Sequence, residues 1–591
     1  MKKKDLRSKE WFDNPKDPGL TALYLERYLN YGLKREDLQS GKPIIGIAQS
    51  GSDLSPCNRH FQALSNVIKD GIREAGGVPM EFPTHPIQET GKRPTAGLDR
   101  NLSYLSLVEV LYGYPIDGVI LTTGCDKTTP AALMAAATVN IPSIVLSGGP
   151  MLDGTYKGKK AGSGTIIWEA RRLHAKGEIS YEEFMDMAAA SAPSIGHCNT
   201  MGTASSMNSI AEALGMSLTG GAIIPAPYKE RESISFKTGK RIVEMVHEDL
   251  TPSKIMTKKA FENAIYVASA IGASSNCPPH LTAIARHMGI DFGIDNWEKL
   301  GHDIPLLVNC QPAGEHLMEG FFKAGGIPAI MQELMKNNKL HKDLMTVTGK
   351  TIAENLIEKI DIDENIIKSF KDPLVNNAGF IVMKSNFFNS AVMKTSVISS
   401  EFRKRYLSNP TSLNLFEANA VVFEGPEDYH LRINDESLNI DENSILMIRG
   451  CGPVGYPGSA EVVNMQPPDK LLKQGINTLP TLGDGRQSGT SESPSILNVS
   501  PESAIGGSLL IVETGDKIKI DLNNSRIDLM ISSEEIEKRR KKVKIPKLEN
   551  QTPWQEISRK MVGQLETGAC LETESLYLDI TNTKGMPRHS H

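Results

Sequence analysis

The alternation of strands and helices between residues 42 and 147 constrains the fold more than any other feature of the sequence. Short apolar runs at 42–48, 78–82, 118–121 and 143–147 are separated by longer segments with helical periodicity. This alternation predicts a parallel, doubly wound α/β sheet. In such sheets ligands bind at the carboxyl ends of the strands, so we expect the functional residues in the loops that follow these runs.

The pattern changes near residue 374. The chain is mostly helical from Tyr181 to about Lys368, whereas short strand-like runs separated by turns follow at 379–383, 420–423, 444–448, 509–512 and 517–522. A chain of 591 residues is also too long for a single hydrophobic core. We therefore predict the α/β class, with an N-terminal doubly wound α/β domain over residues 1–373 and a C-terminal β-barrel-like domain over 374–591.

Composition narrows the class of protein. An apolar content of 39% and a net charge of −5 are typical of a globular protein and give no reason to expect nucleic acid or a membrane as a partner. We see no secretory signal and no run long enough to span a bilayer, so the expected location is the cytoplasm. The seven cysteines are widely spread and do not indicate a disulfide framework. The basic stretch 537–542 is interpreted as a solvated helix face.

Three of these cysteines share one setting. Cys57, Cys125 and Cys198 each come within two residues of a preceding Pro or Gly, where a strand or loop meets a helix. Three thiolates that converge at one sheet edge can hold an iron–sulfur cluster in which one iron lacks a cysteine ligand and can act as a Lewis acid. The alternative is that each cysteine is a small core hydrophobe.

Two carboxylates follow neighbouring strands. Glu89 lies in the loop after 78–82, and Asp126 lies in the loop after 118–121. With a further oxygen, for example from Glu461 in the second domain, they would suit Mg²⁺. One alternative is that Glu89 caps a helix or pairs with Lys92 or Arg93. The other is that Asp126 and Lys127 belong to an ordinary loop with a capping carboxylate and a solvated lysine.

Two glycine-rich segments need separate interpretation. The turn 483–490 presents Ser488, which can act as a base only if nearby cations, such as a metal or Arg486, stabilise its alkoxide. The alternative is a flexible surface turn.

The segment 450–455 fits the pattern GxGxxG after a strand, but residues 456–458 break the helix that would bind a pyrophosphate, so we do not predict a dinucleotide site.

Four motifs taken together resemble the dihydroxyacid/sugar-acid dehydratase family over essentially the whole chain. They are SPCN at 55–58, GCDKTTP at 124–130, GHCNTMG at 196–202 and GDGRQSGT at 483–490. The segments 85–87, 93–96, 98–101 and 464–468 place the chain nearest to the branch that acts on pentonates.

This resemblance implies a set of cofactors and roles. It implies a [2Fe–2S] cluster on the three cysteines and Mg²⁺ on the three carboxylates and on Lys127, whose carboxylated end would be an oxygen ligand. It implies Ser488 as the base with Thr490 nearby, in an active site between the two domains. It also implies a homodimer or homotetramer, in which the C-terminal residues 589–591 reach a neighbouring subunit.

The expected reaction is the dehydration of a small-molecule sugar acid, first of all D-xylonate, to its 2-keto-3-deoxy acid. The C2 proton would be abstracted and the C3 hydroxyl would leave with the help of a Lewis acid. The alternatives are another aldonate such as L-arabinonate or D-gluconate, a branched-chain 2,3-dihydroxy acid, a non-catalytic iron–sulfur sensor, and a zinc-binding structural protein.

Overall fold

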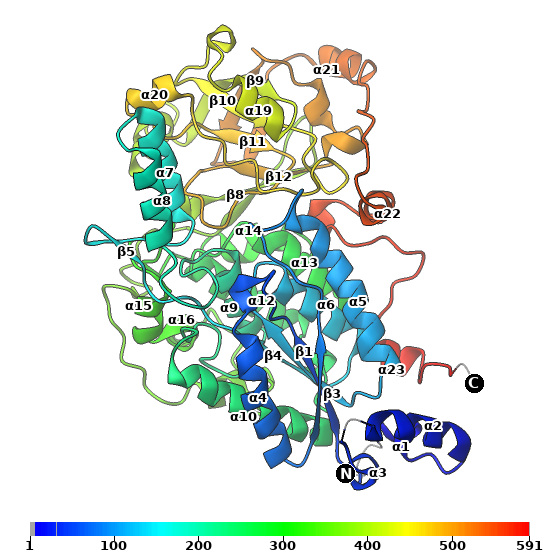
Figure 1. The fold of residues 1–591 in the computed structure, drawn as a ribbon. Coiled ribbons are helices and arrows are strands. Elements are labelled where there is room, and N and C mark those ends of the chain that lie inside the picture. The colour runs from blue at the N-terminus through cyan, green and yellow to red at the C-terminus, as the bar shows by residue number, and fades with distance from the viewer. Residues whose placement is uncertain (1–5, 31, 590–591) are drawn as a thin grey trace.

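A four-stranded parallel sheet forms the centre of the first half of the chain (Figure 1). The computed structural model describes residues 6–30 and 32–589. The strands run in the order β2-β1-β3-β4, and every neighbouring pair is parallel. Their bounds are β1 (Ile44–Gln49), β2 (Val78–Pro83), β3 (Gly118–Thr123) and β4 (Ser143–Ser147). The predicted α/β sheet is confirmed.

The connections between these strands define where a ligand can bind. Helix α4 (Phe61–Glu74) links β1 to β2, α5 (Asp99–Gly113) links β2 to β3, and α6 (Thr128–Val139) links β3 to β4. Helix α4 packs against α10 (Lys229–Glu248), whereas α5 packs against α6 on the opposite face (Figure 1). The chain therefore leaves the adjacent strands β1 and β3 in opposite directions, and their carboxyl ends flank the topological switch point.

An eight-stranded sheet forms most of the second half of the chain, with the order β14-β13-β9-β10-β11-β12-β8-β7. The bounds are β7 (Phe380–Met383), β8 (Ser390–Lys394), β9 (Leu415–Phe423), β10 (Ser444–Ile448), β11 (Thr481–Gly483), β12 (Ile496–Ser500), β13 (Lys517–Asp521) and β14 (Arg526–Leu529). Lys384, just after β7, donates its N–H to the Ser525 carbonyl at 2.8 Å and accepts from Ile527 N–H at 3.0 Å. These bonds join the two edge strands, so the predicted barrel-like sheet is confirmed.

One predicted strand is wrong. Residues 509–512 do not join the sheet, because Ser508–Ile511 form a 3₁₀ helix. Leu509 and Val512 are buried in the barrel core, but their carbonyls accept from the Arg449 guanidinium at 2.8 and 3.0 Å. An apolar run of four residues does not distinguish a strand from a buried helical turn.

The surface of the second half agrees with the interpretation of its basic stretch. Helix α21 (Ser533–Arg540) pairs its cations with nearby carboxylates, including Lys538 with Glu535 and Arg540 with Glu537. Within the part of the chain that is described, no helix is long and apolar enough to cross a membrane.

Candidate active site

The loops at the carboxyl ends of the first sheet meet loops of the barrel around one cavity of about 1100 Å³. Every predicted site residue except Lys127 lines it: Cys57, Glu89, Cys125, Asp126, Cys198, Glu461, Ser488 and Thr490. Lys127 lines a small neighbouring cavity. Residues that are up to 433 positions apart in sequence therefore share one space, because the barrel sits over the switch point of the sheet (Figure 1).

The fold explains how the three cysteines reach this cavity. Cys57 follows β1 in a 3₁₀ turn and Cys125 follows β3, and the N–H of Cys125 donates to Asn58 Oδ1 at 3.0 Å, which ties these two loops together. The loop that carries Cys198 is held to the end of β4 by two backbone bonds between His197 and the segment 149–151. The sulfurs therefore come from three loops at one edge of the sheet.

Two of these cysteines, Cys125 and Cys198, have a thiol pKa above the usual value. Contact with Cys57, burial and nearby carboxylates raise the pKa of Cys125 well above its usual value. Burial raises the pKa of Cys198 to about 11, although Ser163 donates a hydrogen bond to its sulfur at 3.4 Å. Gln88 Nε2 donates to Cys57 Sγ at 3.3 Å. These donors would stabilise thiolates once a bound metal has displaced the thiol protons.

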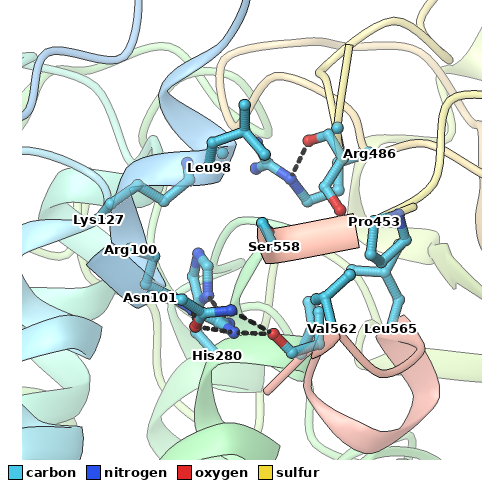
Figure 2. Close-up of a pocket in the computed structure, with 15 residues that line it drawn as sticks. Leu98, Arg100, Asn101, Lys127, His280, Pro453, Arg486, Ser558, Val562 and Leu565 are labelled. Atoms are coloured by element: carbon cyan, nitrogen blue, oxygen red, sulfur yellow. Dashed lines mark hydrogen bonds between the residues drawn. The ribbon is translucent and has the colours of Figure 1, made fainter. Parts of the chain in front are cut away.

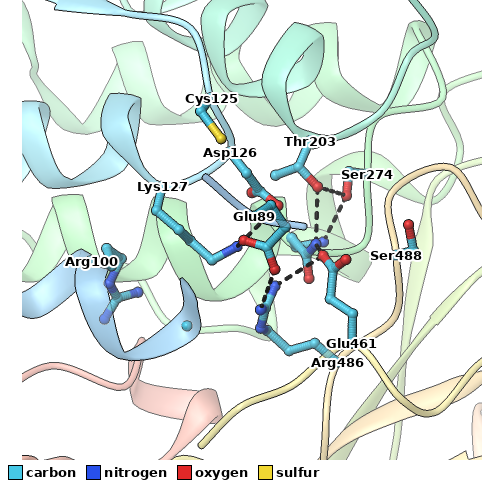
Figure 3. A network of polar contacts seen from close by, with 12 residues as sticks. Glu89, Arg100, Cys125, Asp126, Lys127, Thr203, Ser274, Glu461, Arg486 and Ser488 are labelled. Atoms are coloured by element: carbon cyan, nitrogen blue, oxygen red, sulfur yellow. Dashed lines mark hydrogen bonds and ion pairs between the residues drawn. The ribbon is translucent and has the colours of Figure 1, made fainter. Parts of the chain in front are cut away.

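Three carboxylates converge near Cys125 (Figure 3). Glu89, Asp126 and Glu461 each offer one oxygen, and these oxygens lie within 4.8 Å of one another. Burial and the neighbouring carboxylate of Glu89 raise the pKa of Glu461 to about 8. Asp126 Oδ1 is buried and has no hydrogen-bond partner among the described residues. A cluster of oxygens with an unpartnered member suits a hard divalent cation.

Two buried cations balance these carboxylates. Lys127 Nζ lies 2.5 Å from Glu89 Oε2 and 2.9 Å from Asp126 Oδ2, and Arg486 contacts Glu89 and Glu461 at 3.4 and 3.3 Å (Figure 3). Burial and the charge of Arg486 lower the pKa of Lys127, but the surrounding carboxylates raise it by a larger amount. The pKa of Lys127 therefore lies above its usual value. Lys127 is 1% exposed, so it is not a solvated lysine.

The alternative pairing of Glu89 with Lys92 or Arg93 is wrong. Lys92 pairs with the buried carboxylate of Asp99 instead, whereas Glu89 turns toward Lys127 and Arg486.

A cavity of about 30 Å³ lies behind Lys127 and Arg486 (Figure 2). Arg100 Nη2 donates to the carbonyls of Gly568 and Ala569 at 2.8 and 2.5 Å, which holds the C-terminal segment beneath the site. His280 Nε2 is buried without a hydrogen-bond partner among the described residues. Burial and the neighbouring cations lower the pKa of His280 well below its usual value, so its imidazole is neutral.

The turn after β11 brings Ser488 to the opposite wall of the cavity. Ser488 N–H donates to Asn464 Oδ1 at 3.0 Å, and Ser488 Oγ lies 3.0 Å from Thr490 Oγ1. A Cβ at Gly489 would lie 2.6 Å from Thr203 N, so only glycine permits this close approach. Because Arg486 is 2% exposed and this packing is tight, the turn is not a flexible surface segment.

The glycine-rich segment 450–455 serves a structural purpose. Residues 456–468, directly after it, form no helix, and the N–H groups of Val454 and Gly455 donate to the carboxylate of Glu502. Its backbone donors are therefore already used by the protein.

Several residues at the site carry no signal in the sequence. Trp168, Ser163, Gln88 and Asn276 contact Thr490, Cys198, Cys57 and Glu461 respectively. None lies in a recognisable motif with its partner, and only the tertiary fold brings the pairs together. Arg486 differs from these four residues, because it lies in the same sequence motif as Ser488 and could be singled out from the sequence.

Comparison with known proteins agrees with this geometry. The family models described as "Dihydroxy-acid/6-phosphogluconate dehydratase N-terminal" and "C-terminal" match residues 42–355 and 365–569. The D-xylonate dehydratase of Caulobacter vibrioides is 60% identical over 99% of this chain and 98% of its own. The L-arabinonate dehydratase of Rhizobium leguminosarum bv. trifolii is 44% identical, over 91% and 92%. The dihydroxy-acid dehydratase of Acetivibrio thermocellus is 34% identical, over 92% and 96%.

These matches extend over almost all of the chain, and they confirm the resemblance and the prediction of a hydro-lyase. The alternatives of a non-catalytic sensor and of a structural zinc protein are therefore wrong. The chain belongs to the dihydroxy-acid/6-phosphogluconate dehydratase family.

Proposed function

We propose that this enzyme dehydrates D-xylonate to the corresponding 2-keto-3-deoxy acid. The main support is the relative at 60% identity, which is a D-xylonate dehydratase, whereas the L-arabinonate dehydratase is 44% identical. The structural observation that carries the proposal is the meeting of three cysteines, three carboxylates and Ser488 around one cavity.

Two metal centres belong to the proposal. Cys57, Cys125 and Cys198 would hold a [2Fe–2S] cluster, while the three clustered carboxylates and a carboxylated Lys127 would hold Mg²⁺. The unpartnered oxygen of Asp126 and the ammonium of Lys127 among the carboxylates support a cation at this position. When bound, the two centres would supply Lewis acidity toward the substrate carboxylate and its C2 and C3 hydroxyls.

The residues of the chain then have distinct tasks. Ser488, as its alkoxide, would take the C2 proton, and the C2–H electron pair would form the C2–C3 double bond as the C3–O bond breaks. The departing hydroxide would take up a proton and leave as water. The enol would then become the 2-keto acid by gaining a proton at C3 and losing one from its oxygen. Arg486 would place positive charge near this site, which lowers the energy of the anionic states.

Substitution of Ser488 tests this proposal. Ser488→Ala should lower turnover of D-xylonate by at least about 10³-fold, because a positioned base contributes about 10²–10⁴ to the rate. The visible absorption of the cluster should remain. Ser493→Ala, in the same loop but outside the cavity, is the matched control and should retain activity.

A substrate panel with anaerobically purified protein separates the alternatives. D-xylonate, L-arabinonate, D-gluconate and a branched-chain 2,3-dihydroxy acid would be compared by keto-acid formation. The proposal expects the highest kcat/KM for D-xylonate. A higher value for another acid would reassign the substrate, and full activity of Ser488→Ala would remove Ser488 from its role as the base.

The cellular setting and assembly are part of the same proposal. The seven cysteines are free, as expected for a reducing compartment, and we propose that the enzyme acts in the cytoplasm as a homodimer or homotetramer. Ser590 and His591, which were expected to reach a neighbouring subunit, lie outside the described residues, whereas His589 is described and exposed. We also propose a domain boundary between residues 373 and 374.

A further inference from the structure

We propose that Trp168 is a positioning residue, which fixes the direction of the hydrogen bond between Thr490 and Ser488 and thereby favours proton abstraction by Ser488. Trp168 lies on α7 (Thr165–Lys176) and lines the large cavity. There it faces the barrel loop that carries the hydroxyls of Ser488 and Thr490. The inference rests on the proposed role of Ser488 as the base.

The direction of the first hydrogen bond follows from the chemistry of the indole ring. Trp168 Nε1 lies 3.1 Å from Thr490 Oγ1. An indole nitrogen is a donor only, so the Thr490 oxygen must accept this bond. The hydroxyl proton of Thr490 is then free for another acceptor, and among the described residues the partner in reach is Ser488 Oγ at 3.0 Å. Because the indole N–H occupies one of the two lone pairs of Thr490 Oγ1, the arrangement in which Thr490 donates to Ser488 is favoured over the reverse.

A hydrogen bond in this direction stabilises the alkoxide of Ser488. Its Oγ also accepts from the N–H of Thr490, at a longer distance of 3.4 Å. A hydroxyl oxygen that accepts from two donors must point its own proton elsewhere, and its alkoxide is stabilised by both bonds. Without the indole N–H, Thr490 could rotate and accept from Ser488 instead, which would stabilise the protonated serine.

The structure holds Trp168 in place for this contact. Arg171 lies over the indole ring at 4.8 Å, and Gln466 Nε2 donates to the Trp168 carbonyl at 3.5 Å. Gly164, at the start of α7, has φ +83°, and a Cβ there would lie 2.3 Å from Thr490 Oγ1. Glycine at this position therefore allows α7 to approach the hydroxyl pair closely.

The test is a double-mutant cycle with Trp168→Phe and Thr490→Val, measured on the holoenzyme with D-xylonate. Trp168→Phe keeps an aromatic ring but removes the N–H, and we expect kcat to fall about tenfold while KM changes less than about twofold. The kinetic isotope effect with substrate deuterated at C2 should increase, because proton abstraction becomes slower. In the Thr490→Val background, Trp168→Phe should have no further effect on kcat, since the two residues act through one hydroxyl.

Matched variants control for general damage. Trp554→Phe loses a comparable indole bond, to the Leu98 carbonyl at 2.8 Å, but Trp554 does not line the cavity, and this variant should keep the wild-type kcat. If Trp168→Phe does not fold, Trp168→Leu also has no side-chain donor and takes its place in the cycle.

The outcomes separate this inference from the proposed function. Additive effects of the two substitutions, an effect on KM alone, or an unchanged isotope effect would overturn the role of Trp168. If one of these three results is obtained and Ser488→Ala is inactive, only the role of Trp168 is refuted. If Ser488→Ala retains turnover, the assignment of the base fails first.

Discussion

Ser163 contacts one of the three cysteines that we propose as ligands of an iron–sulfur cluster. Its Oγ donates to Cys198 Sγ at 3.4 Å, and its backbone N–H donates to Asn199 Oδ1 at 2.8 Å, so the side chain is held toward the sulfur. Hydrogen bonds to cysteine sulfurs are among the factors that set the reduction potential of an iron–sulfur cluster, because they stabilise the extra negative charge of the reduced state.

We therefore predict that Ser163→Ala lowers the reduction potential of the cluster while the cluster stays bound. Ser163→Thr keeps the hydroxyl and should restore the wild-type potential. A redox titration followed by electron paramagnetic resonance measures both variants. An identical potential in Ser163→Ala and wild type would show that this hydrogen bond does not reach a cluster ligand.

The sequence identifies some of these residues and not others, for physical reasons. Cys125 and Asp126 are predictable because a buried strand ends just before them and loops at that edge of a sheet bind ligands. Ser163 and Trp168 are not, because a donor that comes from a remote helix leaves no local pattern. The alternative of a solvated Lys127 fails because the carboxylates that surround it come from distant segments.

Among the strands, β8 ends on an unusual residue. Lys394 is 3% exposed, and its Nζ has no hydrogen-bond partner among the described residues. Burial lowers its pKa to about 8 from an ordinary value of 10.5. Burial of this ammonium therefore lowers the free energy of unfolding below about pH 8, where the lysine is charged in both the folded and the unfolded state. This loss of stability shrinks as pH rises toward 10.5, because the folded state then loses the proton before the unfolded state does.

We predict that Lys394→Met raises the free energy of unfolding by up to about 3 kcal/mol at pH 7, since one pKa unit corresponds to about 1.4 kcal/mol. The gain should disappear by about pH 10.5. Chemical denaturation at several pH values measures it, and Lys404→Met, at an exposed lysine, should show little change at any pH. A loss of stability in Lys394→Met at pH 7 would mean that the ammonium has a favourable partner.

The elements differ in how well the sequence predicts them. The four strands of the first sheet are apolar and separated by helices, and all are predicted. The run 509–512 is misassigned because its carbonyls bond to Arg449 rather than to a neighbouring strand, and nothing local indicates that arginine. Closure of the barrel between β7 and β14 depends on contacts about 140 residues apart, which local patterns do not reveal.

At the scale of the whole molecule, neither half of the chain forms the candidate site alone. The first half supplies the cysteines together with Glu89, Asp126 and Lys127, and the second half supplies Glu461, Arg486 and Ser488. Asn276 donates to Glu461 at 2.6 Å, and Arg486 reaches Glu89, so the two halves are joined through the site itself. Activity should therefore depend on the packing of the barrel over the sheet.

The most direct test of this account is the iron and acid-labile sulfide content of the anaerobically purified protein, compared with that of Cys125→Ser. The account predicts about two iron atoms and about two sulfides per wild-type chain, a visible absorption band, and the loss of all three in Cys125→Ser. Cys277→Ala, at a buried cysteine outside the cavity, should keep the wild-type content. A wild-type protein without iron, or a Cys125→Ser protein with the full iron and sulfide content, would contradict it.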